Sequence, residues 1–147
     1  MNELILCYSL TGSSLRFARK LQAAGGADLF EVKEAKPRTM LSAWVSGTRQ
    51  ALSFTKVPLD GSLPDLSSYD DITLVFPVWA GNPAPAFHSV LPLLPKEADV
   101  MLYLVSAGGA TKAKVKEDLM TLFKGAGVRT AEIVDISTDA ANQQPAE

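Results

Sequence analysis

A cluster of short hydroxyl side chains follows the first apolar run of the sequence and could bind an anion. The run Leu4–Tyr8 leads directly into the polar stretch Ser9–Ser14, and a helix-like pattern begins at Leu15. In such a loop, backbone N–H groups, the start of a helix and hydroxyl groups can together hold a phosphate without a positive charge. No Lys or Arg lies between Met1 and Leu15, so the loop matches neither a Walker loop nor a GxGxxG fingerprint. The alternative interpretation is a plain helix-capping cluster.

Two further loops follow apolar runs and carry residues that could contact a ligand. The loop Pro77–Asn82 comes after Ile72–Phe76 and contains Trp79, and the Ser/Gly-rich loop Ser106–Ala110 comes after Val100–Val105. In open α/β sheets, ligands bind beyond the carboxyl ends of the strands. We therefore expect all three loops to contribute to one site.

The other residues that could do chemistry are few. Cys7, the only cysteine, lies inside an apolar run, so we expect an inert buried thiol. His88, the only histidine, has no carboxylate or cysteine at triad-like spacing. One Cys and one His cannot form a zinc cage. No catalytic residue and no metal site are predicted.

The elements that must position these loops alternate between strand and helix patterns. Each crossover is long enough for a helix, which favours parallel strands. The sequence therefore predicts an α/β fold, a doubly wound five-stranded parallel sheet with helices on both faces. The expected strands are Leu4–Tyr8, Asp28–Lys33, Ile72–Phe76, Val100–Val105 and Val128–Ile136, and the expected helices are Leu15–Gln22, Met40–Phe54 with Trp44 in the core, Pro83–Leu94, and Thr111–Lys124 with Thr111 as a cap.

Composition and charge narrow the class of protein. The 147 residues are 47% hydrophobic, which suits one globular domain. A net charge of −2 argues against nucleic-acid binding. The long apolar stretch Ile72–Pro95 is interrupted by prolines, so no membrane span is expected. The opening MNELILCYSL has no basic region typical of a secretory signal, and a cytoplasmic location is expected.

The three loops together resemble those of flavodoxins. Tyr8-Ser9-Leu10-Thr11-Gly12-Ser13-Ser14 resembles the S-x-T-G-x-[ST] phosphate loop, which in that family directly follows the first strand. Tyr69-Asp70-Asp71-Ile72 and the loop Pro77–Asn82 are similar to the family's Y-D-x-[apolar run]-P-x-W-x-G segment. Ser106–Ala110 resembles the family's Ser/Gly-rich loop. The ordered matches cover roughly residues 2–136 and indicate a short-chain flavodoxin-like protein.

The resemblance implies a sheet order of 2-1-3-4-5 and FMN bound without a covalent link. The phosphate would be held by Ser9, Thr11, Gly12, Ser13 and Ser14. The isoalloxazine ring would be flanked by Pro77, Val78, Trp79, Ala80, Gly81 and Asn82. Its other side or its pyrimidine edge would be lined by Ser106, Ala107, Gly108 and Gly109.

The function implied is electron transfer between redox partner proteins, a reductase and an acceptor, with the flavin doing the chemistry. A redox carrier is expected rather than an enzyme with its own substrate. Two alternatives stay open: an NAD(P)H-dependent FMN or quinone reductase of the same fold, and a partner-binding module without flavin. Residues 57–95 hold four aspartates and no Lys or Arg. This acidic excess would disfavour negative charge on a reduced flavin if it lay near the ring, and the alternative, which charged residues favour in general, is ordinary surface charge.

The carboxyl-terminal residues lead to a further expectation. The predicted FMN-binding domain is 1–136, and 137–147 form a polar tail with Asn142, Gln143, Gln144 and Pro145. That tail is too short for a normal cover helix, so the fifth helix is expected to be short or missing. Part of one sheet face would then be bare. We expect either irregular packing of the tail there or cover by a second subunit, as in a homodimer.

Overall fold

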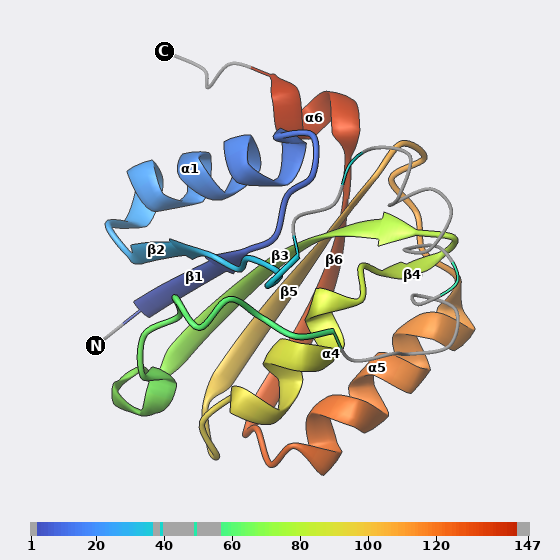
Figure 1. Ribbon diagram of the computed structural model, residues 1–147. Coiled ribbons are helices and arrows are strands. Elements are labelled where there is room, and N and C mark those ends of the chain that lie inside the picture. The colour runs from blue at the N-terminus through green and yellow to red at the C-terminus, as the bar shows by residue number, and fades with distance from the viewer. Residues whose placement is uncertain (1–2, 37–38, 40–48, 50–56, 144–147) are drawn as a thin grey trace.

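Strands and helices alternate along the chain, as the sequence predicts (Figure 1). The computed structural model describes residues 3–36, 39, 49 and 57–143, and the predicted helix Met40–Phe54 with Trp44 lies outside them. The strands are β1 (Glu3–Cys7), β2 (Asp28–Glu31), β3 (Asp71–Trp79), β4 (Asn82–Pro83), β5 (Asp99–Ser106) and β6 (Thr130–Ser137). The helices are α1 (Ser13–Gly25), α4 (Ala86–Val90), α5 (Ala113–Gly125) and α6 (Thr138–Asn142), and the 3-10 turns are η2 (Leu66–Ser68) and η3 (Leu91–Leu93).

The long strands form a parallel sheet in the order β2-β1-β3-β5-β6. When the short strand β4 is left out of the count, β5 and β6 become the fourth and fifth strands, and the order is the predicted 2-1-3-4-5. The register pairs Cys7 with Val75, and Pro77 with Val105. The strands run in the same direction, so the loops that follow β1, β3 and β5 meet at one edge of the sheet.

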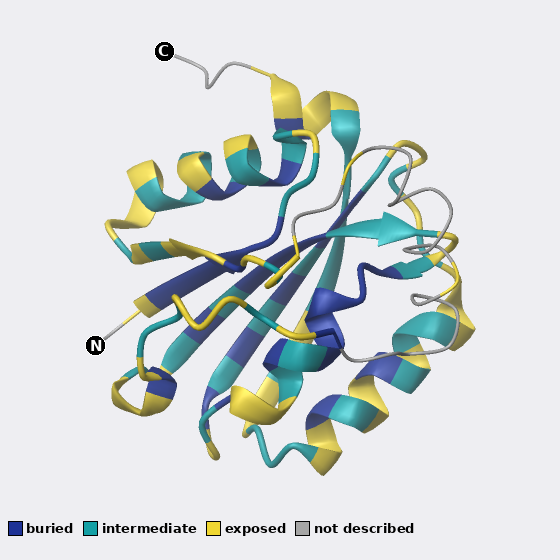
Figure 2. Cartoon of the chain, in the orientation of Figure 1, coloured by how far each residue is buried: buried dark blue, intermediate teal, exposed yellow. Residues whose placement is uncertain are grey.

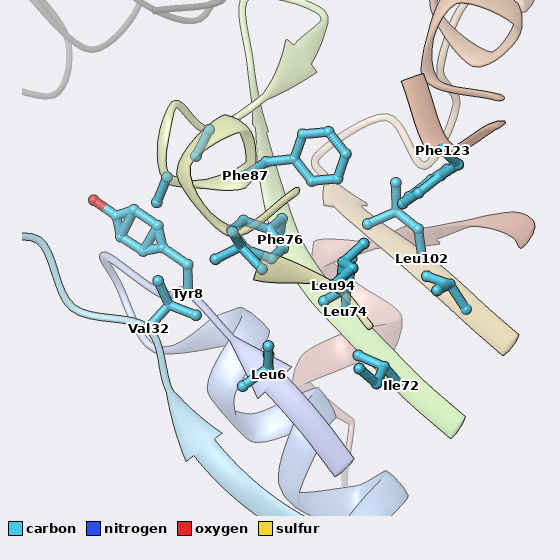
Figure 3. Close-up of a cluster of buried hydrophobic side chains, with 14 of the residues drawn as sticks. Leu6, Tyr8, Val32, Ile72, Leu74, Phe76, Phe87, Leu94, Leu102 and Phe123 are labelled. Carbon is cyan, nitrogen blue, oxygen red and sulfur yellow. The ribbon is translucent and has the colours of Figure 1, made fainter. Parts of the chain in front are cut away.

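Helices cover both faces of the sheet, which explains why the central strands are apolar throughout (Figures 1 and 2). On the face of α4 and α5, the rings of Phe76 and Phe87 pack edge to face at 5.8 Å, and Phe87 packs in the same way on Phe123 (Figure 3). On the face of α1, Ile5 and Cys7 pack with Ala18. The α1 helix ends at Gly25, because Gly26 takes a left-handed conformation with φ 73°.

The segment after β3 differs from the sequence prediction. The prediction of a helix from Pro83 is wrong, because β3 runs on to Trp79 and turns back as a short antiparallel hairpin through β4. Ala80 and Gly81 at the tip both have positive φ, 52° and 83°, which is the twist that a two-residue hairpin requires. A helix begins only at Ala86 and passes into the 3-10 turn η3 at Leu91.

The last helix, α6, is short and packs beside α1, so the predicted short fifth helix is confirmed. Its one buried residue, Ala141, joins the core on the face of α1, while Arg16 Nη1 donates to Asn142 Oδ1 at 2.7 Å. The tail thus begins as a helix rather than an irregular segment. Among the described residues, a groove of about 400 Å³ remains open on this face at the amino ends of the strands, with Met101 and Tyr103 in its lining. The homodimer stays a prediction.

The thiol of Cys7 gives a test of this packing. Burial, with a smaller contribution from Glu31, raises its pKa from 9.0 to about 12. The thiolate fraction at pH 8 is then about a thousandfold lower than in the unfolded chain, and the thiolate is the reactive form. We therefore expect the native protein to react with a thiol reagent such as DTNB far more slowly than the chain in urea. Equal rates would contradict the buried position of this strand.

Candidate functional site

The predicted loops meet at a cavity of about 310 Å³ at the carboxyl ends of β1, β3 and β5. This volume is at the lower end of the range for small-molecule sites, which starts at about 300 Å³. The predicted site residues that line it are Ser9, Thr11, Ser13, Ser14, Pro77, Val78, Trp79, Ala80, Ser106 and Ala107. The predicted residues that do not line it are Gly12, Gly81, Asn82, Gly108 and Gly109. Their roles toward a ligand stay predictions.

Three lining residues were not predicted: Leu10, Val105 and Thr138. Leu10 lies within the first loop, and Val105 in β5 directly precedes the predicted Ser106, so both could have been included by position. Thr138 is different, because it comes from the start of α6, a fourth element. No motif marks it, and only the parallel pairing of β6 with β5 brings it to this edge.

The first loop leaves the start of α1 without a side-chain cap. Ser9 Oγ accepts a hydrogen bond from the Gly12 backbone N–H at 2.8 Å, and Gly12 itself, with φ 100°, is the N-cap of α1. The hydroxyls therefore do not act as the plain helix-capping cluster of the alternative interpretation. The first-turn N–H groups of a helix have no partner within the helix. Ser13 and Ser14 sit in that turn and line the cavity, which makes it suited to an anion.

One positive charge lies beside this loop. It belongs to Arg16, the residue that directly follows the stretch Met1–Leu15 without Lys or Arg. A Cβ built on Gly12 would lie 3.4 Å from Arg16 Nη2, so the guanidinium folds back over the loop. Its other nitrogen is held by Asn142 Oδ1 in α6. Arg16 does not line the cavity, but its charge sits next to the candidate anion site.

The hairpin after β3 presents Trp79 to the cavity from a fixed position. The Trp79 and Tyr8 rings meet edge to face, with centroids 5.8 Å apart. The Tyr8 hydroxyl in turn donates to Glu34 Oε1 at 2.8 Å. An aromatic side chain held in this way forms a rigid wall that suits a flat ring.

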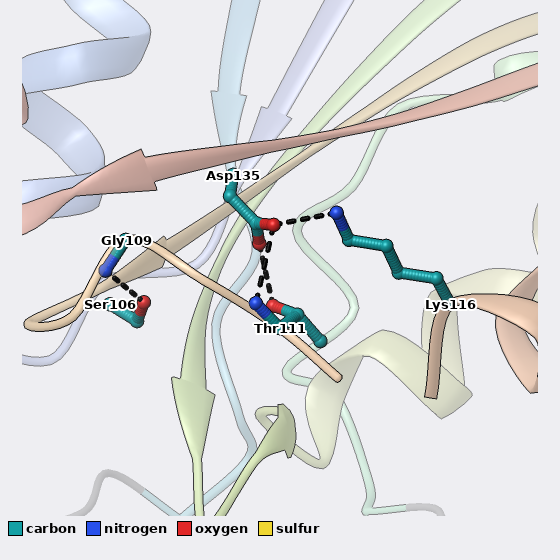
Figure 4. A network of polar contacts seen from close by, with 5 residues as sticks. All are labelled: Ser106, Gly109, Thr111, Lys116 and Asp135. Atoms are coloured by element: carbon teal, nitrogen blue, oxygen red, sulfur yellow. Dashed lines mark hydrogen bonds and ion pairs between the residues drawn. The ribbon is translucent and has the colours of Figure 1, made fainter. Parts of the chain in front are cut away.

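The third loop is closed by its own serine. Ser106 Oγ accepts from the Gly109 N–H at 3.0 Å, and Gly109 has a φ of 66° (Figure 4). The prediction that Thr111 caps α5 is wrong. The N-cap is Lys112, which makes no side-chain cap, and Thr111 Oγ1 instead donates to Asp135 Oδ1 at 2.6 Å.

Every side chain that lines the cavity is uncharged. Three of the four aspartates of residues 57–95 lie elsewhere: Asp71 begins β3, Asp70 directly precedes it, and Asp65 caps η2 ahead of them. The nine residues of β3 place Asp71 about 26 Å from Trp79, at about 3.3 Å per residue. The screening length at physiological ionic strength is about 8 Å. These aspartates therefore contribute little to the potential at the cavity.

Other chemistry is sparse in the part of the chain that the structure describes. No cluster of His, Cys, Asp and Glu suited to a metal ion occurs there. No helix in the described ranges has the length and apolar character needed to cross a membrane. His88 is buried in α4 with its ring 5.2 Å from that of Phe87, away from the cavity.

Comparison with known proteins identifies the fold. No protein-family model and no curated protein matches the chain. A solved structure from Bacteroides eggerthii aligns over 95% of this chain and 92% of its own, with a TM-score of 0.74 and 18% identity. A flavoprotein in complex with FMN from Lactobacillus acidophilus aligns over 90% and 93%, with a TM-score of 0.70 and 23% identity. Two-electron reduced Megasphaera elsdenii flavodoxin aligns over 95% and 88%, with a TM-score of 0.53 and 18% identity. The chain has the flavodoxin-like fold.

The hairpin tip can be tested by a pair of glycine substitutions. Gly81 has a φ of 83°, and a Cβ added there would meet open space, so Gly81→Ala adds only the cost of a left-handed backbone. We expect a loss of about 1 kcal/mol in the free energy of unfolding, measured by urea denaturation. The matched control is Gly108→Ala, where a Cβ also meets open space but φ is not left-handed. Equal effects of the two substitutions would contradict the hairpin conformation.

Proposed function

We propose that this chain binds FMN non-covalently in the cavity and carries electrons between redox partner proteins. The observation that carries the proposal is the meeting of three uncharged loops, one of them with Trp79, at a single cavity. Each loop follows the strand that the resemblance to flavodoxins implies. The similar fold of a flavoprotein in complex with FMN supports the proposal.

The residues present fit FMN at both ends of the molecule. The first turn of α1 and the hydroxyls of Thr11 and Ser13 offer hydrogen-bond donors for the phosphate. Arg16, beside the loop, adds a favourable charge. Pro77, Val78 and Trp79 provide an apolar and aromatic wall for the ring.

The residues that we propose to bind FMN are the predicted residues that line the cavity, together with their neighbours in the same three loops. The phosphate would be held by Ser9, Thr11, Gly12, Ser13 and Ser14, and the ring by 77–82 and 106–109. When bound, FMN supplies one- and two-electron transfer. The chain binds the phosphate, orients the ring and excludes water from its inner side. With uncharged walls, the cavity offers little stabilisation to a negative charge on the ring.

The partners and location follow from this proposal. A carrier without its own substrate needs a reductase and an acceptor, and both would reach the ring from the carboxyl edge of the sheet, where the cavity opens. We place the domain at 1–136 and the protein in the cytoplasm, where a single free thiol such as Cys7 is normally kept reduced.

Flavin binding is tested by titrating the purified chain with FMN and following fluorescence quenching. We expect the wild type to bind, and Thr11→Ala and Ser13→Ala each to weaken binding about 3- to 10-fold, the contribution of one hydrogen bond. The control is Thr121→Ala, whose hydroxyl donates to the Glu117 carbonyl within α5, away from the cavity. If the wild-type chain shows neither flavin absorbance nor quenching, the proposal is wrong, and the alternative of a partner-binding module without flavin is supported instead.

The reductase alternative has a separate test. An NAD(P)H:quinone oxidoreductase from Methanothermobacter marburgensis shares the fold, with a TM-score of 0.52 and 14% identity, so the fold alone does not exclude this activity. We expect the isolated FMN-loaded protein to leave NADH and NADPH unoxidised and to accept electrons once a flavodoxin reductase is added. Steady oxidation of NAD(P)H by the isolated protein would instead support the reductase.

A further inference from the structure

A carboxylate on β6 ties down the loop that leads from β5 to α5. Asp135 Oδ1 accepts from Thr111 Oγ1 at 2.6 Å, and Oδ2 accepts from the Thr111 backbone N–H at 3.2 Å (Figure 4). Lys116 Nζ lies 2.7 Å from the same Oδ2. The Asp135 side chain is only 13% exposed, so these bonds are shielded from water.

The charge on Asp135 is stable under ordinary conditions. Burial alone would raise the pKa of this carboxyl, but the hydrogen bonds from Lys116 and Thr111 outweigh burial and hold the pKa below its usual range. The carboxylate is therefore ionised at neutral pH, and hydrogen bonds to an ionised acceptor are stronger than neutral ones.

The same loop is fixed at a second point by β6. A Cβ built on Gly109 would lie 3.2 Å from Ser137 Cβ, so the loop backbone packs directly against the end of the strand. Ser106 and Ala107, which precede both fixed points in the same loop, line the cavity. Thr111 and Asp135 do not line it, so a positioning effect of Asp135 on a ligand must pass through the loop.

We propose that Asp135 is a positioning residue, which holds the Ser106–Ala110 loop against the flavin through Thr111. The inference rests on the proposed function, because it assigns a role to this loop in FMN binding. It adds to the site a residue that touches neither the cavity nor the ligand. The hydrogen bonds to Thr111 are the feature that matters, and the negative charge itself is secondary.

The chain contains a matched control at the opposite end of the same pair of strands. Asp99, the first residue of β5, accepts from Thr130 Oγ1 at 2.6 Å and forms an ion pair with Arg129. Like Asp135, Asp99 thus bonds to one threonine hydroxyl and pairs with one basic side chain. The eight residues of β5 place it about 23 Å from Ser106, at about 3.3 Å per residue. Asp99→Ala therefore removes a comparable set of polar contacts but leaves the contacts of the Ser106–Ala110 loop in place.

Two conservative variants separate hydrogen bonding from charge. In Asp135→Asn, the amide can still accept from the Thr111 N–H and donate to Thr111 Oγ1, but the charge is lost. In Lys116→Met, the ion pair is lost and the bonds to Thr111 remain. Both variants should bind FMN within about twofold of wild type if the hydrogen bonds do the positioning.

The experiment measures the FMN dissociation constant and the two-electron midpoint potential of bound FMN for each variant, with amide hydrogen exchange of residues 106–111. We expect Asp135→Ala to weaken binding about tenfold, to shift the potential and to speed exchange in this loop. Asp99→Ala should leave all three unchanged, although both alanine variants lose stability to urea.

The outcomes distinguish the two proposals. If the wild type binds FMN and Asp135→Ala binds it as tightly as Asp99→Ala does, the positioning role is overturned and the proposed function stands. If Asp135→Asn and Asp135→Ala shift the potential equally, charge rather than positioning is the cause, and the inference fails. A wild type that binds no FMN overturns both. Should Asp135→Ala not fold, Thr111→Val, which keeps the carboxylate, tests the same contact, and unchanged affinity in it counts against the role.

Discussion

Parallel pairing of strands that are covered on both faces is the constraint on which the rest of this structure depends. Because helices lie on both sides, β1, β3 and β5 can carry almost no polar side chains toward their middle. Chemistry is therefore confined to the strand ends. The register that pairs Pro77 with Val105, and Cys7 with Val75, then brings the following loops to one place although they are far apart in sequence.

The same constraint decides how the cavity can attract a ligand. Its walls hold no charged side chain, so attraction depends on the first-turn N–H groups of α1, on hydroxyls, on the ring of Trp79 and on Arg16 beside the first loop. Carboxylates gather instead at the amino ends of the strands, at Glu3, Asp71 and Asp99. Most of the negative charge near the sheet is thus separated from the site by the length of a strand. A nearly neutral protein can in this way present an uncharged site.

The sequence predicts the parts of this molecule that have a local cause. Continuous apolar runs predict β1, β3 and β5, and the loops that follow them predict most of the cavity lining. The hairpin at Ala80 is not predicted from the sequence, because Pro83 and Pro85 are as typical of a helix start as of a turn. Thr111 is wrongly predicted as a helix cap because its true partner, Asp135, is 24 residues away in sequence, and only the fold brings the two together.

The edge strand β6 shows why such residues are missed. Side chains alternate along a strand, so Asp135 faces α5 while its neighbour Ile136 faces α1, and the sequence around them looks like an ordinary amphipathic edge. Yet β6 runs parallel to β5 for its whole length, and its carboxyl end reaches the same edge of the sheet as the three loops. Ser137 there supports Gly109, and Thr138 lines the cavity. A strand without any recognisable motif thus supports one loop of the site and brings α6 to the cavity, by the same parallel geometry that assembles the three loops.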